Sequence, residues 1–219
     1  MNVKLLQLAS PALPVGAYSY SQGLEAAVEA GIIRDATTAG RWIGDVLALS
    51  VLGMEAPLLL RLVAAWEAGD EAAVRRWNDE LVASRETAEL RAETLQMGYS
   101  LRRLVRSLGV EGAPRLDAFD ELAYPTAFAL AVAAWRIDAH EALAGYLFAW
   151  IENQVLAAVK TVPLGQTEGQ RILLDLAQRI ADGVESAAAL GDDDLFNLAP
   201  GLALLSARHE TQYSRIFRS

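Results

Sequence analysis

The chain has no cysteine among its 219 residues, and it has only two histidines. Without thiols, disulfide bonds, thiolate metal sites and cysteine nucleophiles are all excluded, and the composition is compatible with a cytoplasmic location. Basic residues are also scarce, since 19 lysines and arginines stand against 28 acidic residues and the net charge is −9. An acidic chain with no basic cluster repels the phosphate backbone, so we expect no nucleic-acid partner.

Long uninterrupted apolar runs and a secretory leader are missing as well. The start MNVKLLQLASPALPVG has a single lysine and only a short apolar stretch that prolines break. Glu55, Pro57 and Arg61 interrupt one apolar region, and charged residues within 136–141 divide another. Because a spanning helix needs about 20 mostly apolar residues, we expect no transmembrane segment and a soluble, cytoplasmic protein.

Motifs that carry chemistry are incomplete. His140 and His209 are each followed by glutamate, but HEALA and HETQY lack the second histidine of an H-E-x-x-H zinc site. Gly165 and Gly169 lack the spacing and the lysine of a phosphate-binding loop, and G-x-S-x-G does not occur. We therefore expect no enzyme, with no catalytic residues, no metal ligands and no bound cofactor. Two alternatives stay open: a weak nickel or zinc site shared between chains, and a metal-dependent hydrolase on a helical scaffold.

What the chain does have is helical character. Hydrophobic residues make up 53%, mean hydropathy is +0.21, alanine and leucine dominate, and no long stretch alternates with period 2. The clearest helix spans residues 84–108, and Pro57 is expected to begin another. Helix breaks are expected at Gly31, Gly69, Gly109, Pro163 and Gly191. With no linker or repeat, we predict an all-α fold, a single compact domain of roughly ten helices over residues 1–219, with apolar surface buried against partners.

The two ends of the chain are chemically the most varied. LLQLASPALPVGAYSYSQGLE, residues 5–25, is too polar for a plain core element and too ordered for a disordered leader. The last stretch, residues 207–219, reads ARHETQYSRIFRS and places three arginines beside Tyr213, Ile216 and Phe217. Arginine and tyrosine with apolar anchors are favoured at interface hot spots, so this stretch is predicted to be a partner-docking tail. The alternative is a frayed, charged end.

Four segments resemble the UreF family of urease accessory proteins. They are LLQLASPALPVGAYSYSQGLE, SRETAELRAETLQMGYSLRRL, YLFAWIENQVLAAVKTVPLGQTEGQRILL and HETQYSRIFRS. They occur in the family's order from near Leu5 to Ser219, so the resemblance covers almost the whole chain. Four long segments in order are far more specific than any single motif.

The resemblance implies an all-α homodimer with no catalytic activity of its own. Such a protein joins a UreD-type (also called UreH) partner and recruits the GTPase UreG. The complex acts on apo-urease, where nickel is loaded with carbon dioxide and GTP hydrolysis. The UreF-like member bridges the other chaperones and regulates the GTPase, and part of a nickel passage is a further role open to it. A purely structural adaptor is the alternative.

The resemblance also implies two sets of contact residues. On the UreD side these are Arg208, His209, Tyr213, Arg215, Phe217 and Arg218. On the UreG side, or along the nickel route, these are Tyr18, Ser19, Tyr20, Gln22, Glu25 and Lys160. Within the second set, Glu25 and Lys160 are the pair expected to control the GTPase. The alternative for these residues is local structure, with serines as helix caps, tyrosines in the core and Lys160 at a solvated helix end.

Overall fold

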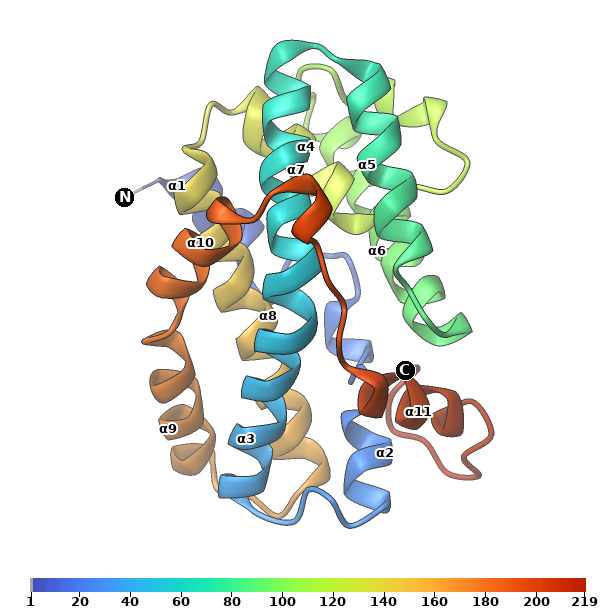
Figure 1. Cartoon of the computed structure of the whole chain (residues 1–219), viewed down its shortest axis with the longest axis vertical. Coiled ribbons are helices and arrows are strands. Elements are labelled where there is room, and N and C mark those ends of the chain that lie inside the picture. The colour runs from blue at the N-terminus through green and yellow to red at the C-terminus, as the bar shows by residue number, and fades with distance from the viewer. Residues whose placement is uncertain (1) are drawn as a thin grey trace.

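The computed structural model describes residues 2–219, and its elements over that range are helical (Figure 1). The α-helices are α1 (Val3–Leu8), α2 (Leu24–Glu29), α3 (Ala36–Val46), α4 (Ala56–Ala68), α5 (Glu71–Ala83), α6 (Ala88–Ser107), α7 (Tyr124–Ala134), α8 (Ala139–Thr161), α9 (Gln166–Ala177), α10 (Ile180–Ala189) and α11 (Pro200–His209). The prediction of an all-helical domain of roughly ten helices is thereby confirmed.

The α-helix predicted to begin at Pro57 is found as α4, which begins at Ala56. It does not stand alone, because α3 and α4 belong to one continuous helical stretch from residue 36 to residue 68. A π-helical segment, Leu47–Glu55, joins them, and the Ala56 N–H bonds to the Val51 carbonyl five residues back. Pro57, which has no N–H, follows at this change of register, so it continues the helix instead of ending it. The freed carbonyls find partners elsewhere, since Phe196 N donates to Gly53 O (3.0 Å) and Leu198 N to Leu49 O (2.8 Å).

Two helices form the centre of the molecule. In α7, eight residues from Pro125 to Val132 are buried in succession. The longer α8 packs against α2, α3, α4, α9 and α10 (Figure 1). A helix that is apolar on most sides is typical of a core position. The packing around α8 therefore explains why its sequence is so rich in alanine, leucine and aromatic residues.

Two helical stretches are long and apolar enough to cross a membrane by length and composition alone. They are Ala36–Ala68 and Ala139–Thr161, and 61% and 50% of their most apolar windows are buried inside the protein. Core helices of a bundle share these properties, so the two stretches are weak support for a membrane location. The expectation of no transmembrane segment stays a prediction.

The C-terminal part of the chain lies beside the start of α6. There α11 packs against α2 and α6, and the C-terminus follows next to them (Figure 1). Thr87 caps α6 by accepting from Leu90 N (3.2 Å), and its hydroxyl also lies 2.7 Å from the Ser206 hydroxyl of α11. This contact joins α11 to the residue that caps α6.

Candidate protein-docking site

The opening segment (residues 17–25) and the C-terminal tail (residues 207–219) lie side by side. Both the N–H and the hydroxyl of Ser21 donate to the carbonyl of Ser219, at 2.7 and 2.5 Å. In the opposite direction, Arg218 N of the tail donates to Ser19 O of the opening segment (2.8 Å). The sequence assigned these segments to two different partners. The structure joins them into one surface.

Two backbone positions of positive φ turn the opening segment into α2. Gly23 has φ +74° and lies against α11, where an added Cβ would be 3.1 Å from Leu202 Cδ1. Gln22 has φ 52°, which is uncommon for a residue other than glycine. Its amide is held at both ends, by donation to Glu93 Oε1 (2.7 Å) and acceptance from Trp150 Nε1 (2.9 Å). Packing and hydrogen bonds therefore hold Gln22 in its unusual conformation.

Glu25 is the centre of the contact between α2 and the tail. Its side chain is almost fully buried, and its Oε1 and Oε2 accept from Ile216 N (2.7 Å) and Phe217 N (2.9 Å). Its Oε2 also lies 3.2 Å from His209 Nε2. Buried carboxylates need such partners, because an unpaired charge away from water is costly. In this structure Glu25 faces the tail of its own chain.

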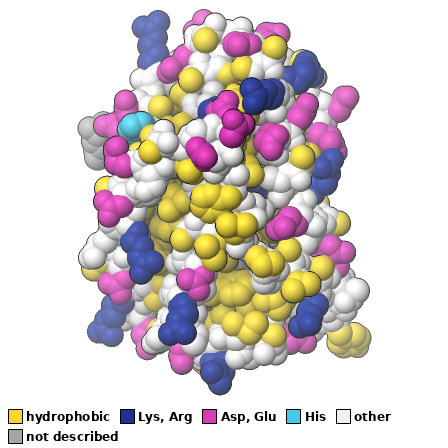
Figure 2. Space-filling view, viewed as in Figure 1, with side chains coloured by type: hydrophobic (Ala, Val, Ile, Leu, Met, Phe, Trp, Pro, Cys, Tyr) yellow, Lys and Arg dark blue, Asp and Glu magenta, His cyan; other side chains and the backbone are white. Residues whose placement is uncertain are grey.

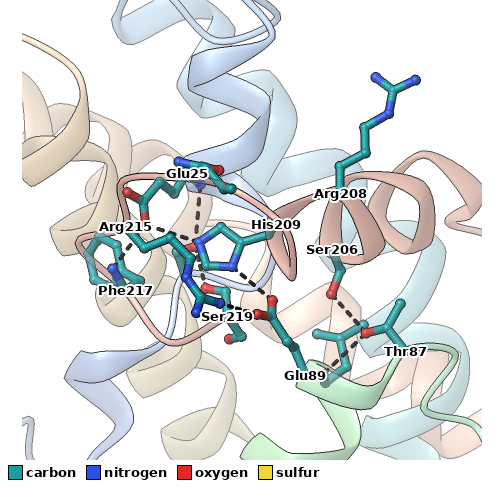
Figure 3. A network of polar contacts seen from close by, with 12 residues as sticks. Glu25, Thr87, Glu89, Ser206, Arg208, His209, Arg215, Phe217 and Ser219 are labelled. Carbon is teal, nitrogen blue, oxygen red and sulfur yellow. Dashed lines mark hydrogen bonds and ion pairs between the residues drawn. The ribbon is translucent and has the colours of Figure 1, made fainter.

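Glu89 on α6 holds the tail from the other side (Figure 3). Its Oε2 lies 2.8 Å from His209 Nδ1, and its Oε1 accepts from Arg215 Nη1 at 2.9 Å. His209 is fully buried between the two carboxylates, one from α2 and one from α6. Each ring nitrogen of His209 therefore faces one carboxylate.

Glu93, one turn further along α6, completes the contact. Its Oε2 accepts from the Ser219 hydroxyl (2.9 Å), and its Oε1 accepts from Gln22. Burial raises the pKa of the Glu93 carboxyl, although hydrogen bonds from Gln22 and Ser219 and the charge of Arg85 lower the pKa in part. Burial and the nearby Glu93 charge also raise the pKa of Tyr20, which is a core residue.

Lys160 reaches the same tail from the end of α8. Its Nζ lies 5.4 Å from the centre of the Phe217 ring, a distance typical of a cation–π contact. The ring itself is buried, whereas Lys160 is exposed. Glu25 and Lys160, which the resemblance paired, thus both contact residue 217.

The tail has an inner and an outer face. His209, Phe217 and Ser219 are buried, with exposed fractions of 0%, 5% and 0%. Tyr213 is fully exposed and Ile216 is 65% exposed. The three arginines Arg208, Arg215 and Arg218 are exposed too, and so is Tyr18 in the opening segment. The predicted contact residues therefore divide into those that hold the tail and those that are available to a partner.

Sequence reasoning missed Glu89, Glu93 and Ser219. The two glutamates are four residues apart on α6, in a helix that was recognised for its apolar face alone. A signal was present, since an acidic pair on one helix face complements a basic tail. This signal did not identify the contact with the tail, because the residues in contact are more than a hundred positions apart in the sequence.

A cavity of about 70 Å³ lies next to this site. Its lining includes Gln22 and Glu93 and, further inside, an ion pair between Arg85 and Glu55. Tyr146 donates its hydroxyl to Glu55, and burial raises the pKa of Tyr146 well above its ordinary value, so the phenol keeps its proton. This cluster ties the π-helical segment before α4, α8 and the segment before α6 together beneath the opening segment.

Neither histidine forms part of a metal cluster in the part of the chain that the structure describes. Within residues 2–219, no group of three or more histidine, aspartate or glutamate side chains is placed to hold a metal ion. His140 is exposed, and its nearest charged partner is Glu185 at 3.9 Å. His209 uses both ring nitrogens toward Glu25 and Glu89. The fold and this surface together define an all-helical protein with an exposed basic and aromatic tail.

Comparisons with known proteins identify the family. The UreF family model matches residues 33–177. The urease accessory protein UreF of Azoarcus sp. (strain BH72) is 59% identical over 222 residues, which cover 99% of this chain and 95% of that protein. The urease accessory protein UreF of Dechloromonas aromatica (strain RCB) is 51% identical over 220 residues, covering 99% and 96%.

The chain therefore belongs to the UreF family of urease accessory proteins. The resemblance inferred from four segments is confirmed. Membership gives the chain a role in urease maturation as an accessory factor that is not an enzyme, and it implies partner accessory proteins.

Proposed function

We propose that this chain is the scaffold of a nickel-delivery complex. Together with a UreD/UreH-type accessory protein, it recruits the GTPase UreG and regulates it while nickel is loaded into apo-urease. Nickel is the cargo of this complex, and the chain itself keeps no resident cofactor. The proposal rests above all on the docked tail, which exposes Tyr213, Ile216 and arginines beside the opening segment.

The tail supplies the kind of surface that a protein partner binds. Tyrosine, arginine and an apolar anchor are enriched at interface hot spots, and here they lie on a segment of fixed position. In a chain of net charge −9, an exposed group of three arginines is electrostatically distinct from the remaining surface. We assign this outer face to the UreD-type partner, and we assign Tyr18 and the adjoining opening segment to the UreG side or the nickel route.

A second surface supports assembly into a homodimer. Figure 2 shows apolar side chains gathered over the middle and lower part of one face. Leu49 and Leu198 are both exposed and are joined through a hydrogen bond between their backbones, and Leu174 and Leu204 are exposed as well. Exposed apolar patches of this kind mark protein interfaces. We infer that the chain pairs with a second copy in the cytoplasm and assembles there with its partners.

Reconstitution from purified components tests the proposal. Apo-urease, nickel, bicarbonate, GTP, the UreD-type partner and UreG are combined with and without this chain. Urease activity and the rate of GTP hydrolysis are then followed. We expect urease activation to require the chain, and the hydrolysis rate of UreG to change when the chain is added. Activation without any change in GTP hydrolysis would leave the structural-adaptor alternative, and activation without the chain would contradict the proposal.

A further inference from the structure

The tail is bound to its own chain through its backbone as much as through its side chains. The two oxygens of Glu25 accept from the consecutive amides of Ile216 and Phe217, at 2.7 and 2.9 Å. Because both contacts are made by backbone groups, they fix the direction of the chain at this point, whatever the side chains are. The chain bends at these two residues, and there the ring of Phe217 is buried whereas Ile216 is exposed.

Charged side chains from α6 and α8 also hold the tail. Glu89 engages His209 and Arg215, so the carboxylates of α2 and α6 hold the tail at its beginning and its middle. On the third side, the Lys160 ammonium lies over the buried ring of Phe217. Charge-assisted hydrogen bonds are roughly twice as strong as neutral ones. The contacts of His209 with Glu25 and Glu89 are buried, whereas Arg215 and Lys160 are exposed.

We propose that Glu25, Glu89 and Lys160 form a clasp that positions the tail, leaving Tyr213 and Ile216 as the apolar contact residues for a partner. Glu25 and Lys160 are positioning residues in this account. They influence urease maturation by orienting the tail, and they do not themselves touch the GTPase. The partner surface that fits the outer face is an apolar pocket bordered by carboxylates, because the exposed Arg208 and Arg218 flank Tyr213 and Ile216 in the sequence, while Arg215 is paired with Glu89. The partner half of this inference rests on the proposed function.

Hydrogen exchange of the chain alone tests the clasp without any partner. Glu25→Gln keeps the size of the side chain but removes the charge and one of the two acceptor oxygens. We expect the amides of the tail to exchange about tenfold faster in this variant, since hydrogen bonds to a charged group are lost. Glu29→Gln is the matched control, because Glu29 lies one turn along α2 and is exposed. Unchanged tail exchange in Glu25→Gln would overturn the clasp.

A second variant keeps the test valid if Glu25→Gln fails to fold. Lys160 is exposed, so Lys160→Ala leaves the core untouched and removes only the contact with the Phe217 ring. We expect faster exchange confined to the tail, with unchanged exchange in α7 and α8. Equal exchange in wild type and Lys160→Ala would remove Lys160 from the clasp.

Binding of the purified UreD-type partner tests the outer face. Tyr213→Ala and Ile216→Ala are each expected to weaken binding about tenfold, as at an interface hot spot, with tail exchange unchanged. Glu25→Gln is expected to weaken binding and to speed tail exchange together. Normal binding by both outer-face variants, in a protein that still activates urease, would overturn the inference and leave the proposed function standing. Loss of self-association in place of partner binding would assign the outer face to a second copy and overturn the partner assignment.

Discussion

Two buried carboxylates of the same site are stabilised in different ways. Glu25 receives two backbone amides and the ring of His209. Glu93 receives one amide side chain and one hydroxyl, and burial dominates its surroundings, so the pKa of Glu93 is raised. Glu25 thus holds the tail through its carboxylate oxygens, whereas the negative charge of Glu93 is costly at neutral pH.

The raised pKa of Glu93 makes a prediction about stability and pH. Because the folded protein holds this proton more tightly than the unfolded chain does, stability from this group is present below the ordinary pKa of 4.5 and is lost as pH rises through the folded pKa. The side chain of Gln does not ionise, so the Glu93→Gln variant does not lose this stability as the pH rises. We therefore expect the melting temperature of the variant, relative to wild type, to rise between pH 4.5 and neutrality, as followed by circular dichroism.

A melting-temperature difference between Glu93→Gln and wild type that stays constant across this pH range would contradict the assignment. Asp35→Asn serves as a control of opposite sign. Hydrogen bonds from Thr38 lower the pKa of Asp35, so its contribution to stability is present at neutral pH and lost in acid.

At the residue scale, the sequence identified the chemistry of the site but not its pairing. Arg208, His209, Tyr213 and Phe217 stood out as a basic aromatic end. Nothing local showed that His209 and Phe217 would be buried while Tyr213 stays exposed, since that depends on α2, α6 and α8. Glu25 was expected at a surface, whereas the tail covers it.

At the element scale, the close approach of α6 and α7 depends on Gly98. A Cβ at this position would overlap the carbonyl oxygen of Leu122 in the backbone before α7. Backbone cannot move aside as a flexible side chain does, so Gly98→Ala is expected to lower the free energy of unfolding by about 2 kcal/mol or more. Urea denaturation followed by fluorescence measures this change.

Gly201→Ala is the matched control for Gly98→Ala. Gly201 lies in the first turn of α11, and an added Cβ there has no neighbour within 4 Å. Alanine is the better helix former, so this substitution is expected to leave stability unchanged or to raise it by about 0.5 kcal/mol. Equal effects of the two substitutions would show that the contact between Gly98 and Leu122 does not limit packing.

Periodicity predicted the helices well where one face is apolar and the other charged. The helix expected at residues 84–108 is found as Ala88–Ser107, capped by Thr87. The α-helix expected from Pro57 is found as α4, but its continuous join to α3 was not predicted, because a π-helical segment changes the register just before the proline. Phe196, which follows α10, donates its backbone N–H to Gly53 in the π-helical segment. No local sequence pattern reveals this contact.

At the scale of the whole molecule, the tail presents a surface to a partner and also covers Glu25, Glu89 and Glu93. Deleting residues 209–219 is expected to abolish binding of the UreD-type partner while the helical content of the body remains. It also leaves Glu25, Glu89 and Glu93 without their tail contacts, so the melting temperature is expected to fall. Binding and circular dichroism on the same preparation measure both effects, and intact partner binding would remove the tail from the interface.

The fold class and the family followed from the sequence because they depend on composition and on long ordered segments. The relation between the opening segment and the tail did not, since their contacts join residues about 200 positions apart. That relation matters for function. Segments expected to serve separate partners form one surface, so binding at one of them is expected to affect the other.

The central claim is that this chain is a scaffold, and the mass of its assemblies tests that claim most directly. Size-exclusion chromatography with light scattering is run on the chain alone and with the UreD-type partner and UreG. For the chain alone we predict a mass of twice 23.6 kDa, which is that of a dimer. When both partners are added, we predict a larger assembly that contains them. A 23.6 kDa monomer that leaves both partners at their own masses would contradict the account.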